Sequence, residues 1–265
     1  MATDDIVLLE RDGPVVTLTL NRPAVHNAFD EALIAALTGH FLELADDEGV
    51  RVVVLTGMGK SFSAGADLNW MKRAAAYDEE QNRADARALA IMLKCLDELP
   101  KPTIARVNGA ALGGGVGLVA ACDFAIAAET AVFATSEVRL GLVPGVISPF
   151  VIRAIGGRQA RRYFMTAERF DAVTAKAIGL VHEVVATDQL DAAVTKVIGE
   201  LLQGGPTAQG AAKQLVKLVQ SMPQGGSLLT EGTVGAIAEA RGSAEGKEGI
   251  GAFLEKRSAA WRQGR

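Results

Sequence analysis

The chain has 265 residues, of which 49% are hydrophobic and 22% charged. This composition is typical of a globular protein with a substantial core and excludes a disordered chain. The 27 basic and 31 acidic residues give a formal net charge of −4. That balance argues against a dedicated nucleic-acid-binding protein, which would carry a basic excess. The apolar run 116–128 is interrupted by Asp123 and is too short to span a membrane, so we expect no membrane partner.

The cysteine and histidine content points to a reduced, metal-free protein. Cys95 and Cys122 lie in apolar stretches and cannot form a disulfide framework, so we expect a cytoplasmic protein with buried thiols. The acidic, polar N-terminus is unlike a signal peptide. His26, His40 and His182 are scattered, with no two at the spacing of metal ligands, so we expect no metal site.

Apolar patterning predicts the elements of the first hundred residues. We expect strands at 6–10 and 15–20, a helix over 27–44, a buried strand at 50–55, a helix from about 68 and a longer one over 79–98. The continuous β-branched character of 50–55 is typical of a strand that is buried on both faces. Pro100 and Pro102 close the long helix.

The same pattern then repeats. We expect a strand at 103–107, a glycine loop at 109–115, a helix at 116–122 and short strands at 124–127 and 132–134. Strand, loop and helix thus recur every 40 to 50 residues or so, which predicts stacked β-β-α units with parallel strand layers, an α/β fold. Beyond about Val185 the expected elements are helices only. We therefore expect a core domain at 1–200 that holds the functional site and a helical region at 201–265.

Two short glycine-rich loops are the most informative features. Residues 62–67 and 113–115 each follow an apolar run and open into an expected helix. Backbone N–H groups at a helix start point outward and favour negative charge. Two such donors that converge on one oxygen would form an oxyanion hole, and Glu137, about 20 residues after the second loop, could transfer a proton.

Seven motifs, in this order along nearly the whole chain, resemble the enoyl-CoA hydratase/isomerase (crotonase) family. They are Asn21-Arg22-Pro23 with Asn27-Ala28, Phe62 to Leu68, Asn108-Gly109 with Leu112 to Gly115, Cys122-Asp123, Ser136-Glu137 with Leu140-Gly141, Ala177 with Gly179 to Val181, and Phe253 to Arg257. The resemblance implies a spiral of β-β-α units and a C-terminal helical region that mediates trimerisation, often with pairing of two trimers into a hexamer. It also implies acyl-CoA thioester substrates and no cofactor beyond the coenzyme A of the substrate.

The resemblance also assigns the site residues. It makes Glu137 the acid/base and the Ala66 and Gly114 N–H groups the oxyanion donors. Ala64 and Leu68 would border the coenzyme A, and the segment of Phe253 and Lys256 would reach the coenzyme A site of a neighbouring subunit. The full set of expected substrate-binding residues is Ala64, Asp67, Leu68, Gly117, Phe253 and Lys256.

One position departs from the family pattern. Typical hydratases of the family carry a first glutamate where this chain has Gly117, so that only Glu137 remains. Water addition benefits from two groups, whereas a double-bond isomerase can use one. Our leading prediction is a hydratase that adds water to, or removes it from, a branched α,β-unsaturated acyl-CoA. The alternatives are an enoyl-CoA Δ3-Δ2 isomerase that uses Glu137 alone and a non-catalytic acyl-CoA-binding subunit.

Further segments resemble bacterial methylglutaconyl-CoA hydratases. These are Asp67 to Lys72, Ile147 to Phe150 and Arg158 to Tyr163. The substrate that this resemblance implies, 3-methylglutaconyl-CoA, carries a distal carboxylate and would need a cationic or amide partner. Arg139 and Lys72 are the candidates in this sequence, and leucine breakdown is the implied context.

Overall fold

The computed structural model describes residues 5–222 and 226–262, which form two compact units. The first unit comprises the chain up to Leu99 together with Thr103–Thr195, and the second comprises Pro100–Pro102 and the chain from Lys196 onward. The division between them falls within α7 (Leu190–Leu201). All strands of the described residues belong to the first unit.

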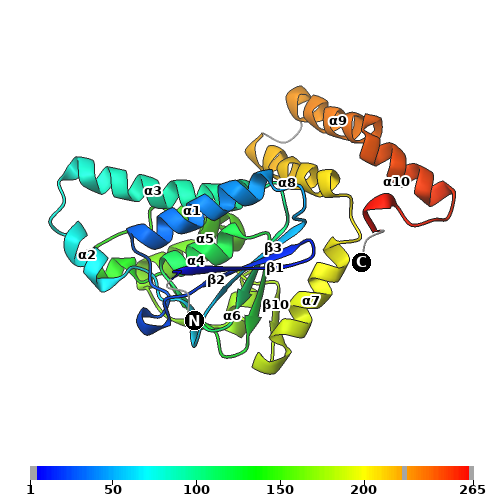
Figure 1. The fold of residues 1–265 in the computed structure, drawn as a ribbon. Helices are drawn as coiled ribbons and strands as arrows, with labels where there is room; N and C mark the ends of the chain where they lie inside the picture. Colours follow the sequence, from blue (N-terminus) through cyan, green and yellow to red (C-terminus); the bar gives the residue numbers. More distant parts are fainter. Residues whose placement is uncertain (1–4, 223–225, 263–265) are drawn as a thin grey trace. The chain divides into compact units, whose positions relative to one another are not determined.

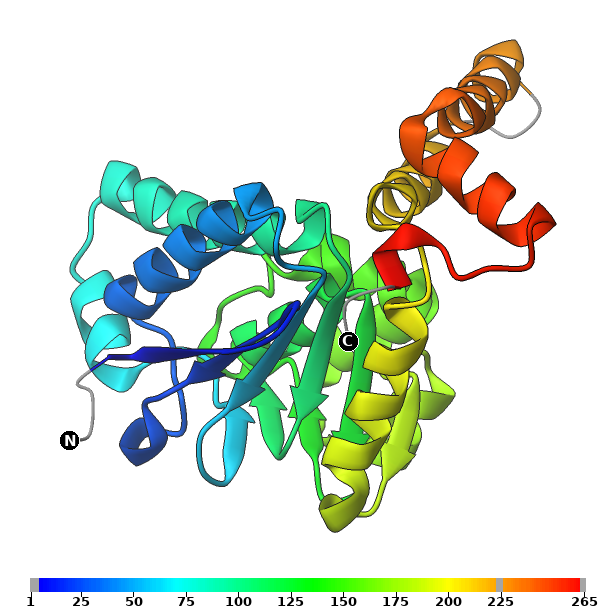
Figure 2. The same ribbon diagram turned by 45° about the vertical axis from the view of Figure 1, so that its right-hand side comes forward.

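The first unit contains two sheets (Figures 1 and 2). The larger has the order β1 (Val7–Asp12), β2 (Val15–Leu20), β3 (Val52–Gly57), β5 (Thr103–Val107), β7 (Phe124–Ala128) and β10 (Glu183–Val185). The smaller has the order β4 (Ser61–Ser63), β6 (Ala110–Leu112), β8 (Val132–Ala134) and β9 (Phe170–Asp171). Only the β1–β2 hairpin and the β8–β9 pair are antiparallel.

From β3 to β8, successive strands alternate between the two sheets, which makes this part of the unit a spiral. β3, β5 and β7 are parallel neighbours in the larger sheet, and β4, β6 and β8 are parallel neighbours in the smaller one. Each turn of the chain therefore adds one strand to each sheet and then a helix. This confirms the predicted α/β fold of β-β-α units.

Helices cover the sheets and close the core. They are α1 (Glu31–Asp46), α2 (Leu68–Ala74), α3 (Glu79–Glu98), α4 (Gly114–Ala121), α5 (Ser148–Thr166) and α6 (Ala172–Ala177). α1 and α3 run side by side in both views, and α4 packs against α3 and α5 (Figures 1 and 2). Because α4 is buried over almost its whole length, its small residues allow close packing on all sides.

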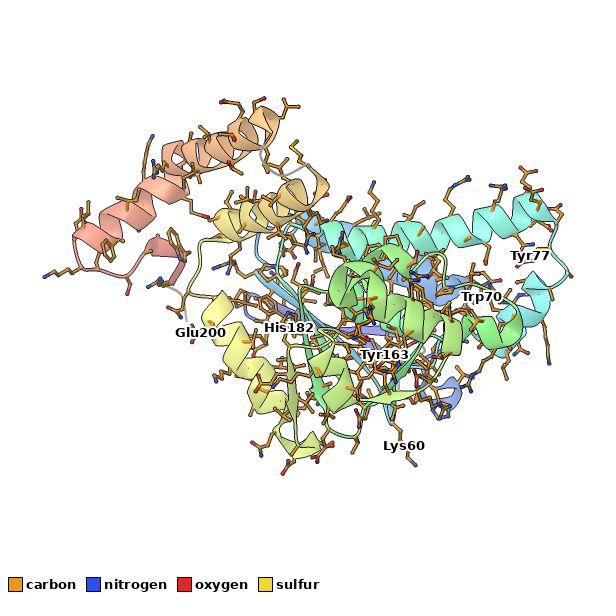
Figure 3. The ribbon with its side chains drawn as sticks, turned by 180° about the vertical axis from the view of Figure 1, so that it is seen from behind. Lys60, Trp70, Tyr77, Tyr163, His182 and Glu200 are labelled. Carbon is orange, nitrogen blue, oxygen red and sulfur yellow. The ribbon has the colours of Figure 1, made fainter. Side chains whose placement is uncertain are left out.

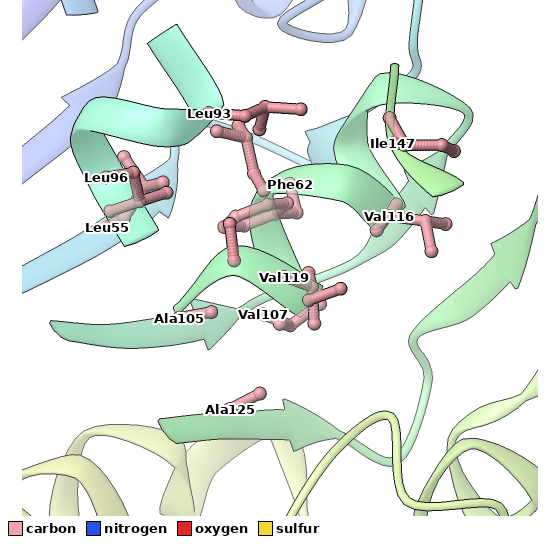
Figure 4. Packing of buried hydrophobic residues seen from close by; sticks show 14 of the residues in the cluster. Leu55, Phe62, Leu93, Leu96, Ala105, Val107, Val116, Val119, Ala125 and Ile147 are labelled. Carbon is pink, nitrogen blue, oxygen red and sulfur yellow. The ribbon is translucent and has the colours of Figure 1, made fainter. Parts of the chain in front are cut away.

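The core is built mainly from aliphatic side chains with a few aromatic rings. Phe62, Leu93 and Val119 are fully or almost fully buried and belong to one cluster that α3, α4 and the strands share (Figure 4). Tyr163 of α5 is labelled in Figure 3. The centroid of its ring lies 4.3 Å from the centroid of the Phe170 ring. Packing of this kind fixes the spacing of the spiral turns and hence the positions of the loops between them.

The helix boundaries follow local capping signals. The helix expected over 27–44 begins later, at Glu31, because the Asp30 side chain accepts a hydrogen bond from the Leu33 N–H and caps the first turn. Residues 27–30 are not helical, and the preceding residues Pro23–Val25 form a short 3-10 helix, η1. The helix predicted over 79–98 is confirmed, and Asp78 with Gln81 forms its capping box.

The second unit is helical. It contains the end of α7, α8 (Pro206–Ser221), α9 (Ser227–Gly242), α10 (Ala244–Leu254) and the short η4 (Ala260–Arg262). α8 packs on α9, and α10 packs on both. None of the helices formed by the described residues combines the length and the apolar character that a membrane crossing needs.

Successive spiral turns touch at Gly109, between β5 and β6. A Cβ atom added there would collide with the backbone carbonyl oxygen of Lys60, which lies between β3 and β4 of the preceding turn. The atoms that the added Cβ would meet all belong to the backbone of Lys60 and Ser61, so no flexible side chain could move aside. The corner of the spiral therefore requires glycine.

We expect Gly109→Ala to lower the free energy of unfolding by about 1–3 kcal/mol, because one turn must move away from the next. Gly39→Ala on α1 is the matched control, since nothing lies within 4 Å of the added Cβ and alanine favours the helix. The control should raise stability by up to about 1 kcal/mol. Urea titrations of both variants give the comparison, and equal midpoints would contradict the tight corner.

Candidate active site

Three loops meet at one edge of the smaller sheet. Ser63 of β4 pairs with Ala111 of β6, and Leu112 of β6 pairs with Ala134 of β8. Because the strands are parallel, the loops that follow them all leave from the same edge, the usual position of ligand sites in parallel sheets. The Gly113 N–H donates to the Ala134 carbonyl at 2.8 Å and extends this register into the loops. The two glycine-rich loops and the segment of Glu137 are thus neighbours.

The two glycine loops approach each other closely. Gly65 and Gly113 have φ angles of 86° and 50°, in the left-handed region that favours glycine. A Cβ on Gly65 would lie 3.0 Å from the Leu112 carbonyl oxygen. A Cβ on Gly113 would lie 3.3 Å from Oε1 of Glu137. Side chains at either position would therefore separate the parts of the site.

A backbone bridge to Phe29 orients Ala66. The Phe29 N–H donates to the Gly65 carbonyl at 2.6 Å, and the Phe29 carbonyl accepts from the Asp67 N–H at 2.8 Å. Because these bonds use the groups on either side of Ala66, the N–H of Ala66 points away from Phe29. Ala66 is exposed and lines the cavity described below. Its N–H is therefore placed to donate to a ligand.

The second donor is the first N–H of α4. Gly114 begins this helix, so its N–H has no carbonyl partner within the helix and lies at the positive end of the helix dipole. A Cβ on Gly114 would lie 2.9 Å from Cε2 of Phe29. Phe29 thus contacts both loops, through its backbone at Ala66 and through its ring at Gly114.

Glu137 begins the 3-10 helix η2 (Glu137–Leu140), directly after β8. Its Oε2 atom is buried and has no hydrogen-bond partner among the described residues. Burial of the carboxyl raises the pKa of Glu137, although a hydrogen bond from its own backbone N–H opposes the shift. A half-buried carboxyl with a raised pKa and one oxygen that lacks a partner is a group that can both accept and donate a proton in a reaction.

These groups share a cavity of about 330 Å³. Its lining residues are Phe29, Ala64, Gly65, Ala66, Trp70, Met71, Leu89, Gly113, Gly114, Ser136, Glu137, Leu140, Leu142, Val143, Pro144, Gly145, Val146 and Ile147. Four predicted site residues are therefore brought together, Ala64, Ala66, Gly114 and Glu137. Glu137 is the only charged residue in this lining, and the remaining wall is mostly apolar.

The Asp67 side chain stabilises the local structure and does not line the cavity. Its carboxylate is buried, accepts hydrogen bonds from the N–H groups of Asn69 and Trp70, and pairs with Arg22 at 3.1 Å. Burial disfavours its charged form, but these bonds and the Arg22 charge together lower the pKa of Asp67. Arg22 also pairs with Asp30 at 2.7 Å. Asp67 thus caps α2 and ties its loop to the segment that carries Phe29.

The other expected substrate-binding residues do not line this cavity. The Leu68 side chain is 75% exposed, at the start of α2. Gly117 is buried within α4. Phe253 and Lys256 are exposed residues of the second unit. Their roles in binding coenzyme A stay predictions.

Sequence reasoning did not identify the apolar wall. Leu140, Leu142, Val143, Val146 and Ile147 follow Glu137 directly, and this run of apolar residues in a glycine- and proline-containing loop is the signal that could have indicated a binding surface. Such a run is unusual for a loop that faces only water.

Trp70 forms another part of the wall that sequence reasoning did not identify. Its indole N–H donates to Oδ1 of Asp85 at 2.9 Å, which fixes the ring at the end of the unit where α2 lies (Figure 3).

Among the residues that the structure describes, no three His, Cys, Asp or Glu side chains gather as a metal ion would require.

Comparisons with known proteins agree with this geometry. The profile of the family described as enoyl-CoA hydratase/isomerase matches residues 10–264. The chain belongs to this family. An enoyl-CoA hydratase structure from Shewanella pealeana is 44% identical, with a TM-score of 0.93 and coverage of 97% of this chain and 96% of that one. The predictions of the family, of its fold and of an enzyme are confirmed.

Two curated relatives differ in the substrates that their names state. The short-chain-enoyl-CoA hydratase of Clostridium acetobutylicum is 34% identical and covers 95% of both chains. The 2,3-dehydroadipyl-CoA hydratase of Escherichia coli is also 34% identical, over 95% of this chain and 96% of its own. Similar overall sequences in this family therefore accompany different acyl groups.

Replacing Glu137 with glutamine should change how stability depends on pH. Because burial raises the folded-state pKa of Glu137 above 4.5, the wild type loses stability relative to Glu137→Gln as pH rises through the raised pKa. Below about pH 4.5 the carboxyl is protonated in both states, so the difference in Tm should be constant there. Thermal unfolding of both proteins from acid to neutral pH checks this. A constant difference over the whole range would contradict the buried carboxyl.

Proposed function

We propose that this protein adds water to, or removes it from, α,β-unsaturated acyl-CoA thioesters. The observation that carries the proposal is the Glu137 carboxyl, with its unpartnered Oε2 atom, in the same cavity as the outward N–H groups of Ala66 and Gly114. Proton transfer and oxyanion stabilisation are the two demands of this reaction. Hydratases among the relatives support the choice of reaction.

In the proposed mechanism, the thioester oxygen accepts hydrogen bonds from Ala66 and Gly114. These bonds draw electron density from the double bond and stabilise the enolate oxygen that forms. Glu137 takes a proton from water as the water oxygen bonds to C3. The same carboxyl then delivers a proton to C2, and the thioester carbonyl re-forms. The coenzyme A is part of the substrate, and we propose that no other cofactor takes part.

The apolar wall supports an acyl group that is apolar near the reacting carbons, including a branched one. 3-Methylglutaconyl-CoA, which would connect the enzyme with leucine breakdown, requires a partner for its distal carboxylate. Lys72 and Arg139 are exposed and do not belong to the cavity lining. We therefore propose branched acyl groups as the substrate class, with the distal carboxylate of 3-methylglutaconyl-CoA directed outside the described cavity.

Isomerisation of a 3-enoyl-CoA to the 2-enoyl-CoA is the second candidate. The single carboxyl in the cavity favours it, because one base can move a proton between two carbons of the same substrate. A non-catalytic acyl-CoA-binding subunit is the third. Such a protein would have no use for a buried carboxyl with an unpartnered oxygen beside the two donors, since that carboxyl costs stability.

The test is incubation of the protein with crotonyl-CoA, 3-methylcrotonyl-CoA and 3-methylglutaconyl-CoA in ¹⁸O-labelled water, followed by mass spectrometry. We expect labelled 3-hydroxyacyl-CoA, and we expect Glu137→Gln to lower turnover about 10²- to 10⁴-fold while affinity for the ester is retained. Glu80→Gln, on the exposed surface of α3, is the matched control and should keep full activity.

Three outcomes would contradict the proposal in different ways. A loss of less than tenfold in Glu137→Gln would remove Glu137 from the mechanism. Conversion of 3-enoyl-CoA esters without label uptake would establish isomerisation instead. Tight binding of every ester without conversion would leave the acyl-CoA-binding subunit.

We further propose a cytoplasmic homotrimer, or a hexamer formed from two trimers. The second unit supports the assembly, because Leu228, Val234, Ile237, Ile250 and Phe253 are large apolar side chains that it exposes. Cys95 and Cys122 are not joined in a disulfide, in keeping with a reducing compartment.

Light scattering at micromolar concentration should give three or six times the chain mass of 27.6 kDa. The exposed apolar side chains should be covered in such an assembly, which is the physical reason to expect it. A monomeric mass would contradict the proposed assembly without affecting the assignment of Glu137.

A further inference from the structure

Gly117 lies one turn into α4 and has no room for a side chain. A Cβ added there would collide with Cγ2 of Ile147 and would lie 3.1 Å from its Cβ and 3.4 Å from Cδ1 of Leu93. The volume next to Gly117 is therefore filled by the side chain of Ile147. Figure 4 shows Ile147 together with Val116 and Leu93 around the start of α4.

Ile147 reaches this position from the segment that follows Glu137. It is the last residue before α5, is only 2% exposed, and its carbonyl accepts a hydrogen bond from the Val151 N–H in the first turn of that helix. Ile147 lines the cavity, whereas Gly117 beneath it does not. At this point of α4 the wall of the cavity is therefore formed by the Ile147 side chain and not by the Gly117 backbone.

We infer that Ile147, seated on Gly117, is the residue that sets which acyl groups the cavity accepts. This inference rests on the proposed function, because it deepens the assignment of the same cavity. Its γ-methyl group takes the space in which any side chain at position 117, charged or not, would have to lie. It thereby gives the cavity an apolar wall of fixed size and leaves Glu137 as its only carboxyl.

A wall of this kind discriminates by size. A difference of one methylene in an apolar pocket changes specificity by about 10- to 200-fold. Removal of the Ile147 side chain beyond Cβ should therefore favour bulkier acyl groups over crotonyl. Because the Gly117 Cβ position collides with Cγ2 in particular, only variants that lack this methyl should also make room for a side chain at 117.

The first experiment compares Ile147→Ala with Ile147→Val. We measure kcat/KM for crotonyl-CoA, 3-methylcrotonyl-CoA and hex-2-enoyl-CoA, and the dissociation constants of the saturated butyryl-, isovaleryl- and hexanoyl-CoA. Ile147→Ala should shift the preference for at least one bulkier ester over the C4 ester by about tenfold or more. Ile147→Val removes only the Cδ1 methyl and keeps Cγ2, so it should shift the preference by less than Ile147→Ala does.

Val151→Ala is the matched control for loss of packing. Val151 is buried on α5, one turn after Ile147, and does not line the cavity. The Val151→Ala substitution should lower the Tm and leave the preference between esters unchanged. An unchanged preference in Ile147→Ala would overturn the inference. Binding is measured as well as turnover, so the size preference is tested even if no ester is hydrated, in which case only the proposed reaction fails.

A double-mutant cycle tests the contact itself. Gly117→Ala alone should lower activity or affinity, because the new methyl displaces Ile147 into the cavity. Adding Ile147→Ala should restore the loss at least in part, whereas adding Ile147→Val should not. Additive effects in both double variants would overturn the proposed seating of Ile147 on Gly117.

Discussion

The parallel register of β4, β6 and β8 is the constraint on which the site depends. Parallel strands leave a sheet at a common edge, so the three following loops converge without any long connection. Each of these strands has only three residues, and a shift of one residue would move every loop relative to the others. The larger sheet and the close contact at Gly109 hold the successive turns in place, and this fixes the register of the short strands.

Phe29 positions the two candidate oxyanion donors, Ala66 and Gly114, relative to each other. Its backbone fixes the direction of Ala66, and its ring packs against Gly114, so one residue relates the two candidate donors. The ion pairs of Arg22 with Asp30 and Asp67 connect the segment of Phe29 to the loop of Ala66 from the other side. Rigid placement matters here because donors stabilise an oxyanion only if they need no rearrangement when the charge develops.

The site combines an apolar wall with a single carboxyl, that of Glu137, whose buried Oε2 atom lacks a hydrogen-bond partner among the described residues. In a folded protein such a group costs stability, because burial disfavours its charge and no donor compensates its buried oxygen. The same burial raises the pKa of Glu137, which suits a carboxyl that both takes and delivers a proton. Ile147 extends the apolar wall over Gly117, so the proposed chemistry and the proposed selectivity depend on the same few residues after β8.

The sequence by itself determined the order of β-β-α units and the long helix over 79–98, because apolar periodicity is a local signal. From two glycine-rich loops and the family resemblance it also predicted Ala66, Gly114 and Glu137 as site residues, and the structure brings these three together at one cavity. It also marked Gly117 as a departure from the family pattern. Only the tertiary structure decided that Asp67 pairs with Arg22, that Phe29 joins the two loops and that Ile147 fills the space at Gly117. These contacts join residues 30 or more positions apart, and such proximity is set by strand register and helix packing, which no local pattern records.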